Sequence, residues 1–232
     1  MRHIPVSMVI LAVTVVAISS CNSITGKKHI NEGIIKYEIT YDSITSKKID
    51  TRLFPSALLV QFKNNNTLNT IDVFSGTVSL SIAKNEMLQQ YITLVKVFNK
   101  KMYYDEPYVD GKYPALYARI PAVTLTSNNV PCKYLGYKCL KAKGYFADRR
   151  ESEFEIIYTR EIGIRSPNVN TPFEQIDGVM LTFNLRINSL MMILKAKSVR
   201  GNSIPDGIFE IPEDYTRVDF QTITELIYLL QQ

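Results

Sequence analysis

Apolar and polar residues alternate along much of the chain. From residue 35 to residue 41, the odd positions carry Ile, Tyr, Ile and Tyr, and the even positions carry Lys, Glu and Thr. A period of two is typical of a strand with one buried and one exposed face. Apolar runs bounded by turn-forming residues predict further strands at 57–62, 68–74, 77–82, 91–98, 140–146, 151–158 and 208–212. The pattern predicts a mainly β protein, with a polar loop over 42–52.

The longest alternating segment, residues 179–199, predicts a β-hairpin with a two-residue turn at Asn188 and Ser189. Counting outward from this turn pairs Ile187 with Leu190, Leu185 with Met192, Phe183 with Leu194, and Leu181 with Ala196. All eight side chains fall on the same face of the hairpin. This hairpin is therefore expected to present a broad apolar surface.

Helical spacing is clearest near the end of the chain. Thr222 and Glu225 have the spacing of an N-terminal capping box. Apolar residues follow on one helical face, at Ile223, Leu226, Ile227 and Leu230. Such an amphipathic helix needs an apolar partner. The expected architecture is one antiparallel sheet covered by one or two short helices, including this C-terminal one.

The first twenty-one residues have the organisation of a secretory signal. Arg2 supplies a basic start, residues 4–18 are almost all apolar, and small residues precede Cys21. The sequence Ile18-Ser19-Ser20-Cys21 resembles the lipobox of bacterial lipoproteins. That resemblance implies cleavage before Cys21, a diacylglycerol on its thiol and an acylated amine.

This resemblance implies a division of the chain into a signal peptide at 1–20, a polar tether at 21–31 and a β domain at 32–232. The alternatives are an uncleaved membrane anchor and cleavage without lipidation. The apolar run is shorter than the roughly 20 residues that span a bilayer, which disfavours an uncleaved anchor.

Charge and histidine content exclude several classes of function. The net charge is only +5 over 232 residues, which gives no indication of nucleic-acid binding. The chain has two histidines, His3 and His29, and both precede the predicted domain. A body without imidazole cannot use Ser-His-Asp catalysis or a histidine metal site. We therefore expect no enzyme, no metal and no cofactor.

Cys132 and Cys139 are the two cysteines left after Cys21. An exported protein meets an oxidising compartment, where two thiols in one domain tend to pair. The glycine between them, Gly136, allows the chain to turn back. A disulfide is predicted; the alternative is two separate thiols, buried or half-buried.

Tyrosines are concentrated between residues 102 and 121, together with prolines and a glycine that favour a long structured loop. Those that form the candidate contact surface are Tyr103, Tyr104, Tyr108 and Tyr113. A tyrosine offers both an apolar ring face and a hydroxyl, so this loop is a candidate surface for a protein partner. Alternatively, its aromatic side chains fix it to the core.

Three carboxylates, Glu151, Glu153 and Glu155, share one face of a predicted strand. Such a row fits an acid pair or a calcium site. We instead expect it to face solvent and pair with Lys141 and Lys143 on the preceding strand.

Several segments resemble a family of exported proteins of uncharacterised function that is named for a Gly-Leu-Pro-Gly-Leu-Ile motif. The matching segments are Leu135–Ala142, Tyr158–Thr159, Ile176–Leu181 and Phe209–Tyr215. Gly178 matches a glycine of the motif, and Asp177 stands where the family has a proline. The resemblance implies a single curved antiparallel sheet, a half-barrel, like that of the outer-membrane lipoprotein carrier proteins, whose concave face holds acyl chains.

A lipid anchor beside an apolar sheet face suggests a periplasmic lipoprotein that binds a lipid or another hydrophobic ligand. The candidate ligand-binding residues are Leu181, Phe183, Leu185, Met192 and Leu194. Alternatively, these residues are simply core, covered by the C-terminal helix. A second function is a structural or assembly module whose tyrosine-rich loop contacts an envelope protein. The expected location is the outer membrane, facing the periplasm.

Overall fold

The computed structural model describes residues 29–48, 50–148, 152–187 and 190–229. The predicted signal peptide, Cys21 and the tether as far as Lys28 lie outside the described residues, as do Glu151 and the turn at 188–189. Ile30 and Asn31 already contact the body, because the Ile30 carbonyl accepts a hydrogen bond from the Gly163 amide at 2.8 Å.

The described residues form twelve strands and two α-helices. The strands are β1 (Glu32–Tyr41), β2 (Ala57–Lys63), β3 (Asn66–Val73), β4 (Val78–Asn85), β5 (Gln90–Val97), β6 (Lys100–Pro107), β7 (Val123–Tyr134), β8 (Tyr137–Phe146), β9 (Phe154–Thr159), β10 (Val179–Ile187), β11 (Leu190–Gly201) and β12 (Thr216–Arg217). The helices are α1 (Ser43–Lys48) and α2 (Phe220–Leu229), with short 3₁₀ turns η1 (Thr51–Leu53), η2 (Phe74–Gly76), η3 (Tyr117–Arg119) and η4 (Asp206–Phe209).

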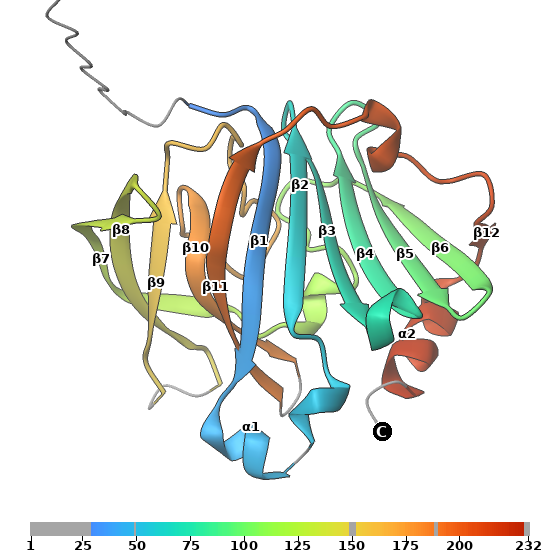
Figure 1. The fold of residues 1–232 in the computed structure, drawn as a ribbon, viewed down its shortest axis with the longest axis horizontal. Helices are drawn as coiled ribbons and strands as arrows, with labels where there is room; N and C mark the ends of the chain where they lie inside the picture. Colours follow the sequence, from blue (N-terminus) through green and yellow to red (C-terminus); the bar gives the residue numbers. More distant parts are fainter. Residues whose placement is uncertain (1–28, 49, 149–151, 188–189, 230–232) are drawn as a thin grey trace, which may run out of the picture.

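All twelve strands belong to one open, curled sheet in the order β12-β6-β5-β4-β3-β2-β1-β11-β10-β9-β8-β7 (Figure 1). Strands β2 to β6 and strands β7 to β11 form two antiparallel meanders, and β1 joins them by pairing with both β2 and β11. The edge strand β12 pairs with β6 in parallel. The structure confirms the predicted fold class, a mainly β protein with one curved sheet and a short C-terminal helix.

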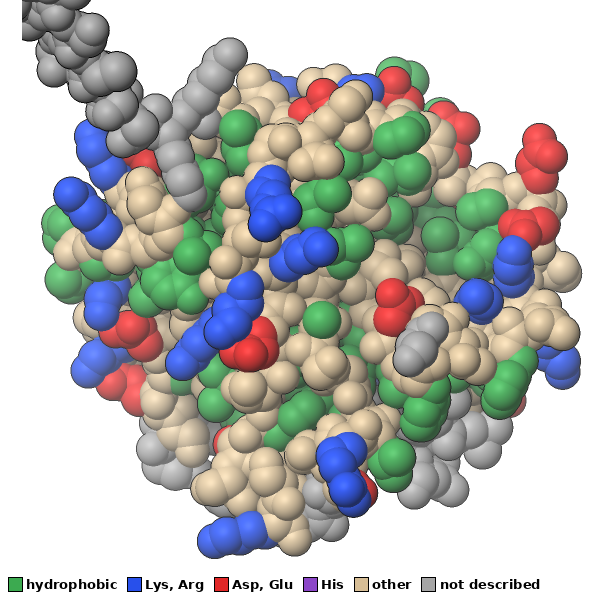
Figure 2. Space-filling model, in the orientation of Figure 1, with side chains coloured by type: hydrophobic (Ala, Val, Ile, Leu, Met, Phe, Trp, Pro, Cys, Tyr) green, Lys and Arg blue, Asp and Glu red, His purple; other side chains and the backbone are tan. Residues whose placement is uncertain are grey.

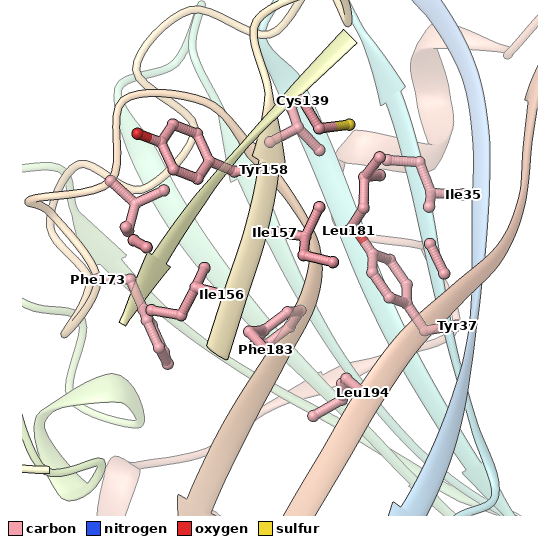
Figure 3. Close-up of a cluster of buried hydrophobic side chains, with 14 of the residues drawn as sticks. Ile35, Tyr37, Cys139, Ile156, Ile157, Tyr158, Phe173, Leu181, Phe183 and Leu194 are labelled. Carbon is pink, nitrogen blue, oxygen red and sulfur yellow. The ribbon is translucent and has the colours of Figure 1, made fainter. Parts of the chain in front are cut away.

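The two faces of the sheet bury different sets of side chains. The larger set, which we call the inner cluster, includes Ile35, Tyr37, Cys139, Ile156, Ile157, Tyr158, Phe173, Leu181, Phe183 and Leu194 (Figure 3). The outer face carries the outer cluster, made of Leu68, Ala83, Ile92, Leu94, Ile204 and Phe209. Because both faces of β4 and β5 are covered, successive residues Tyr91 to Val95 are all buried.

The predicted hairpin forms with the expected register. Ile187 lies opposite Leu190, Leu185 opposite Met192, and Phe183 opposite Leu194. The pairing continues to Thr182 opposite Lys195, and the fourth expected pair, Leu181 with Ala196, is not part of it. Both of these residues are nevertheless fully buried in the inner cluster.

Two predicted loops contain regular structure. Within residues 42–52, expected to be a loop, Ser43–Lys48 form α1, where the Asp42 carboxylate accepts a hydrogen bond from the Thr45 amide at 2.8 Å. Residues 100–107, which overlap the predicted tyrosine-rich loop, form β6 and pair with β5 along their whole length. The strand conformation of β6 is therefore stabilised by its pairing with β5. The prolines and the glycine that suggested a loop lie at the end of β6 and beyond it.

The predicted strand at 208–212 is wrong. Residues 206–209 form the 3₁₀ turn η4, and Phe209 is buried in the outer cluster. The same apolar residues that suggested a strand cover the sheet from outside instead of joining it. The adjoining segment then leads to β12 and α2.

The C-terminal helix begins earlier than predicted. Asp219 is its N-cap, because its carboxylate accepts a hydrogen bond from the Thr222 amide at 2.7 Å, so Thr222 lies within the helix. The helix packs beside β6, where the rings of Phe220 and Tyr104 are 5.3 Å apart. In the part of the chain that the structure describes, we find no helix with the length and apolar character needed to cross a membrane.

Candidate ligand-binding cavity

The inner side of the curl encloses an apolar cavity of about 350 Å³. Its walls come from β1 to β5 on one side, from β10 and β11 on the other, from Ile227 of α2, and from the connecting segments at 53–55, 116–120 and 164–173. In Figure 1 the segment that carries η3 passes behind β1 to β3, on this inner side. Cavities of roughly 300 to 1,000 Å³ are the usual size of small-molecule sites.

Strands β3 and β4 form the wall on which the sequence pattern is simplest. Ile71 lies opposite Leu80, and Val73 lies opposite Val78, so apolar side chains face each other in rows across the two strands. Further along the same two strands, Leu68 lies opposite Ala83, and both belong to the outer cluster. This part of the wall, from Ile71 to Val73 and from Val78 to Leu80, is therefore mainly apolar.

The predicted ligand-binding residues divide between this cavity and the core. Phe183, Leu185, Met192 and Leu194 line the cavity. Leu181 does not line it and is fully buried within the inner cluster (Figure 3). Of the five predicted residues, Leu181 is thus packed core and the other four are cavity wall, as are Val179 and Met180 at the start of β10.

Tyrosine hydroxyls hold two of the cavity walls in place. Tyr37 donates to the Met180 carbonyl at 2.7 Å, which links β1 to β10. Tyr41 donates to the Pro55 carbonyl at 2.6 Å and places the segment after η1 at the cavity. Burial raises the pKa of both hydroxyls, that of Tyr41 to about 12, so both stay protonated and continue to donate near neutral pH.

The cavity wall is almost free of charge. Arg119 is the one charged side chain among the described lining residues, and its guanidinium lies over the ring of Phe220 at 5.7 Å. The other hydrogen-bonding groups are neutral: Asn69 donates from its amide to the Tyr117 hydroxyl at 3.3 Å. Burial raises the pKa of Tyr117 to about 12. Such a wall suits a largely apolar ligand with few polar atoms.

Cys132 and Cys139 lie directly opposite each other in the hairpin of β7 and β8, and both are free thiols in the structure. Opposed residues of antiparallel strands have Cα atoms roughly 4.5 to 5.5 Å apart, within the range that disulfides occupy. The buried Cys139 thiol donates to the Tyr137 carbonyl at 3.5 Å. The disulfide therefore stays a prediction, between residues that the fold places as neighbours.

The four candidate tyrosines are in contact with the body. Tyr103 and Tyr104 belong to β6, where Tyr103 packs against the outer cluster and Tyr104 against α2. The ring of Tyr108 stacks on that of Tyr91 at 5.6 Å, and Tyr113 is half-buried. Their contacts match the alternative in which the aromatic side chains fix the loop to the core, and a protein partner there stays a prediction.

The carboxylate row pairs across strands as expected. Lys141 lies 3.0 Å from Glu155, and Lys143 lies 3.7 Å from Glu153. Figure 2 shows basic and acidic side chains interspersed over one face of the molecule. Within the described ranges, no three Cys, His, Asp or Glu side chains are placed to hold a metal ion.

Several wall residues were absent from the predicted site. The whole wall from β2 to β4 was missed, together with the polar residues Asn69, Tyr91 and Tyr117. Period-two alternation from Val78 to Ile82 was a usable signal for the β4 part of the wall. The sequence alone gave no signal for Tyr117, because its place depends on how the segment between β6 and β7 folds back over the sheet.

The comparisons with protein families and with curated proteins found no relative of this chain. No protein-family model matches the chain, and a search of curated proteins finds no match to it. The geometry of the cavity and the chemistry of its wall are therefore the basis for the function proposed below.

Proposed function

We propose that this chain is a membrane-anchored lipoprotein of the periplasm that binds a lipid or another long apolar ligand in the cavity inside its curled sheet. The observation that supports this proposal is the cavity of about 350 Å³ with its almost uncharged wall. Its volume is more than twice that of the 150 Å³ engineered cavities that accept benzene. Lipidation at Cys21 would keep this cavity close to a membrane that supplies apolar ligands.

The role is proposed as binding and not catalysis. Arg119 is the single charged group among the described wall residues, so the wall offers no pair of an acid and a base. Binding of an apolar chain needs only the removal of its surface from water, worth about 25 cal/mol per Å² of buried apolar area.

The test is to identify non-covalent lipid that purifies with the full chain, by mass spectrometry after mild extraction. The wild type is expected to retain lipid, and Leu185→Trp, which fills the cavity from β10, is expected to retain several-fold less. Val60→Phe on β2 fills it from the opposite wall and serves as a second variant. Ile193→Trp adds the same ring to β11 but outside the cavity wall, and should retain lipid as the wild type does.

Thermal unfolding shows whether each variant is folded. Lipid at trace levels in the wild type, or equal amounts in the folded filling variants and the control, would contradict the proposal.

A second candidate is an assembly module with no small ligand. Large apolar side chains are exposed at Leu53, Phe74 and Phe98, and Phe74 and Phe98 lie at adjacent strand ends, where the Phe98 amide donates to the Thr77 carbonyl at 2.9 Å. Such residues favour a protein contact. Cross-linking from this end that captures an envelope protein, combined with lipid-free wild type, would favour this candidate.

A further inference from the structure

A small recess adjoins the apolar cavity and differs from it in chemistry. It has a volume of about 30 Å³, which is the room that one water or one hydroxyl group occupies. Five of its residues carry polar groups, namely Thr67, Asn69, Tyr91, Tyr117 and Thr171, and Lys84 lies at its wall. Because residues such as Thr67, Asn69 and Tyr117 line both spaces, the recess is a polar extension of the cavity.

The recess lies at one end of the cavity. Thr67, at the start of β3, lines the recess, and Phe74, just beyond the end of β3, lines the other end of the cavity and is 56% exposed. A strand rises about 3.3 Å per residue, so about 23 Å separate the two ends. The cavity therefore extends from an exposed apolar end to a polar end, which is the polarity of a long-chain amphiphile.

Tyr91 supplies an unused hydrogen-bonding group at the recess. Its side chain is 4% exposed, and among the described residues its hydroxyl has no hydrogen-bond partner. Burial raises the pKa of Tyr91, and the side-chain amide of Asn170 lies close enough to lower it in part but forms no hydrogen bond of normal geometry with its hydroxyl. This amide accepts from the Gly111 amide and donates one N–H to the Val109 carbonyl, both at 2.9 Å. A buried hydroxyl without a partner is unusual, which points to a ligand atom as its partner.

The recess is electrically neutral. Lys84 lies 2.9 Å from Glu86, and its ammonium lies over the ring of Tyr108, so its charge is already matched. The Tyr117 hydroxyl accepts from Asn69 and has its own proton left to donate. A small neutral group that accepts and donates hydrogen bonds fits this arrangement, whereas a phosphate is too large and too charged.

We propose that the ligand is a single-chain amphiphile with a small uncharged head group, such as a long-chain alcohol, bound with its head between Tyr91 and Tyr117 and its chain along β3 and β4. This inference rests on the proposed function, because the chain must first occupy the apolar cavity. The head group supplies the partner that the Tyr91 hydroxyl lacks, and the apolar tail reaches towards Phe74.

The test measures how well decanol and decane, which have chains of equal length, displace a fluorescent phenylnaphthylamine probe from the full chain. In the wild type, decanol is expected to displace the probe at a concentration about three- to tenfold lower, the effect of one net hydrogen bond. Tyr91→Phe should abolish this preference and leave displacement by decane unchanged. The variant loses no hydrogen bond within the described protein, so it is expected to fold.

Tyr37→Phe is the matched control. Tyr37 also lines the cavity, but its hydroxyl already donates to Met180, so the preference for decanol should persist in this variant. If neither compound displaces the probe from the wild type, the proposed function fails. If both displace it equally, or if Tyr91→Phe keeps the preference, the head-group assignment fails and the apolar cavity remains.

Discussion

At the scale of single residues, the chemistry of the thiols is set by burial. Cys139 is 4% exposed, and burial is the main cause that raises the pKa of its thiol from 9.0 to about 11. The neutral thiol is favoured in the folded protein, and only the thiolate is a nucleophile. Cys132, opposite it, is half-buried.

This burial predicts slow alkylation of Cys139. At pH 8 only about one thiol in a thousand is ionised for a pKa near 11, so iodoacetamide should modify Cys139 far more slowly than a free model thiol, with the rate rising towards pH 11. The folded state keeps this proton to higher pH than the unfolded state does, so the Cys139 contribution to stability is lost as pH rises from about 9 to 11.

Peptide mapping by mass spectrometry on wild type and Cys132→Ser measures this rate at each pH. Alkylation of the folded variant at the rate of a model thiol at pH 8 would contradict the burial argument. A linked peptide that is lighter by two hydrogens would instead establish the predicted disulfide.

The packing of two neighbouring strands explains why residue 178 is a glycine. A Cβ atom at this position would come within 2.7 Å of the Thr159 carbonyl oxygen on the neighbouring strand. The close approach of β9 and β10 therefore requires glycine, whatever the function of the chain. Asp177, beside this glycine, is exposed and pairs with Arg160 at 3.1 Å.

At the scale of elements, the hairpin of β10 and β11 could be predicted from sequence because its register depends on local pairing. Alternation on both strands placed Leu185 opposite Met192, as observed. The start of α2 could not be placed as well, because Asp219 and Thr222 both offer a capping side chain. Only the geometry of the preceding chain shows that Asp219 is the cap.

Two positions on β10 predict different costs of truncation. Leu181→Ala removes a fully buried side chain from the inner cluster and is expected to destabilise the fold by about 3 to 5 kcal/mol. Leu185→Ala removes a half-buried side chain that already borders the cavity, so fewer contacts are lost and about 1 to 2 kcal/mol is expected.

Urea unfolding, followed by circular dichroism, measures the free energy of unfolding of each variant and of the wild type. Equal costs at the two positions would mean that the hairpin face is packed core throughout, which contradicts the division between core and cavity wall.

At the scale of the whole molecule, period-two alternation was enough to predict one antiparallel sheet. It could not predict where the inner face is filled and where it is open, since Leu181 and Phe183 are equivalent in the sequence pattern. That difference depends on the curl of the sheet and on segments such as 116–120 and 164–173, which cross its inner side. The partner of α2 was likewise set by tertiary contacts, which place Phe220 against Tyr104.

The lipid anchor and the cavity are independent parts of the proposal. The anchor at Cys21 is predicted from the resemblance of the first residues to a lipobox, and it lies outside the described residues. The cavity is a property of the folded body, between β3 and β4 on one side and β10 and β11 on the other. A ligand can therefore be sought in the cavity without reference to the anchor.

The most direct measurement is a crystal structure of the full chain grown with bromodecane, in which anomalous scattering locates the bromine. We predict bromine signal and chain density within the cavity, in contact with residues such as Leu80 and Leu185. A structure in which the inner face of β3 and β4 packs directly on β10 and β11, with bromine only on the outer surface, would contradict the central claim that the curled sheet encloses a binding cavity.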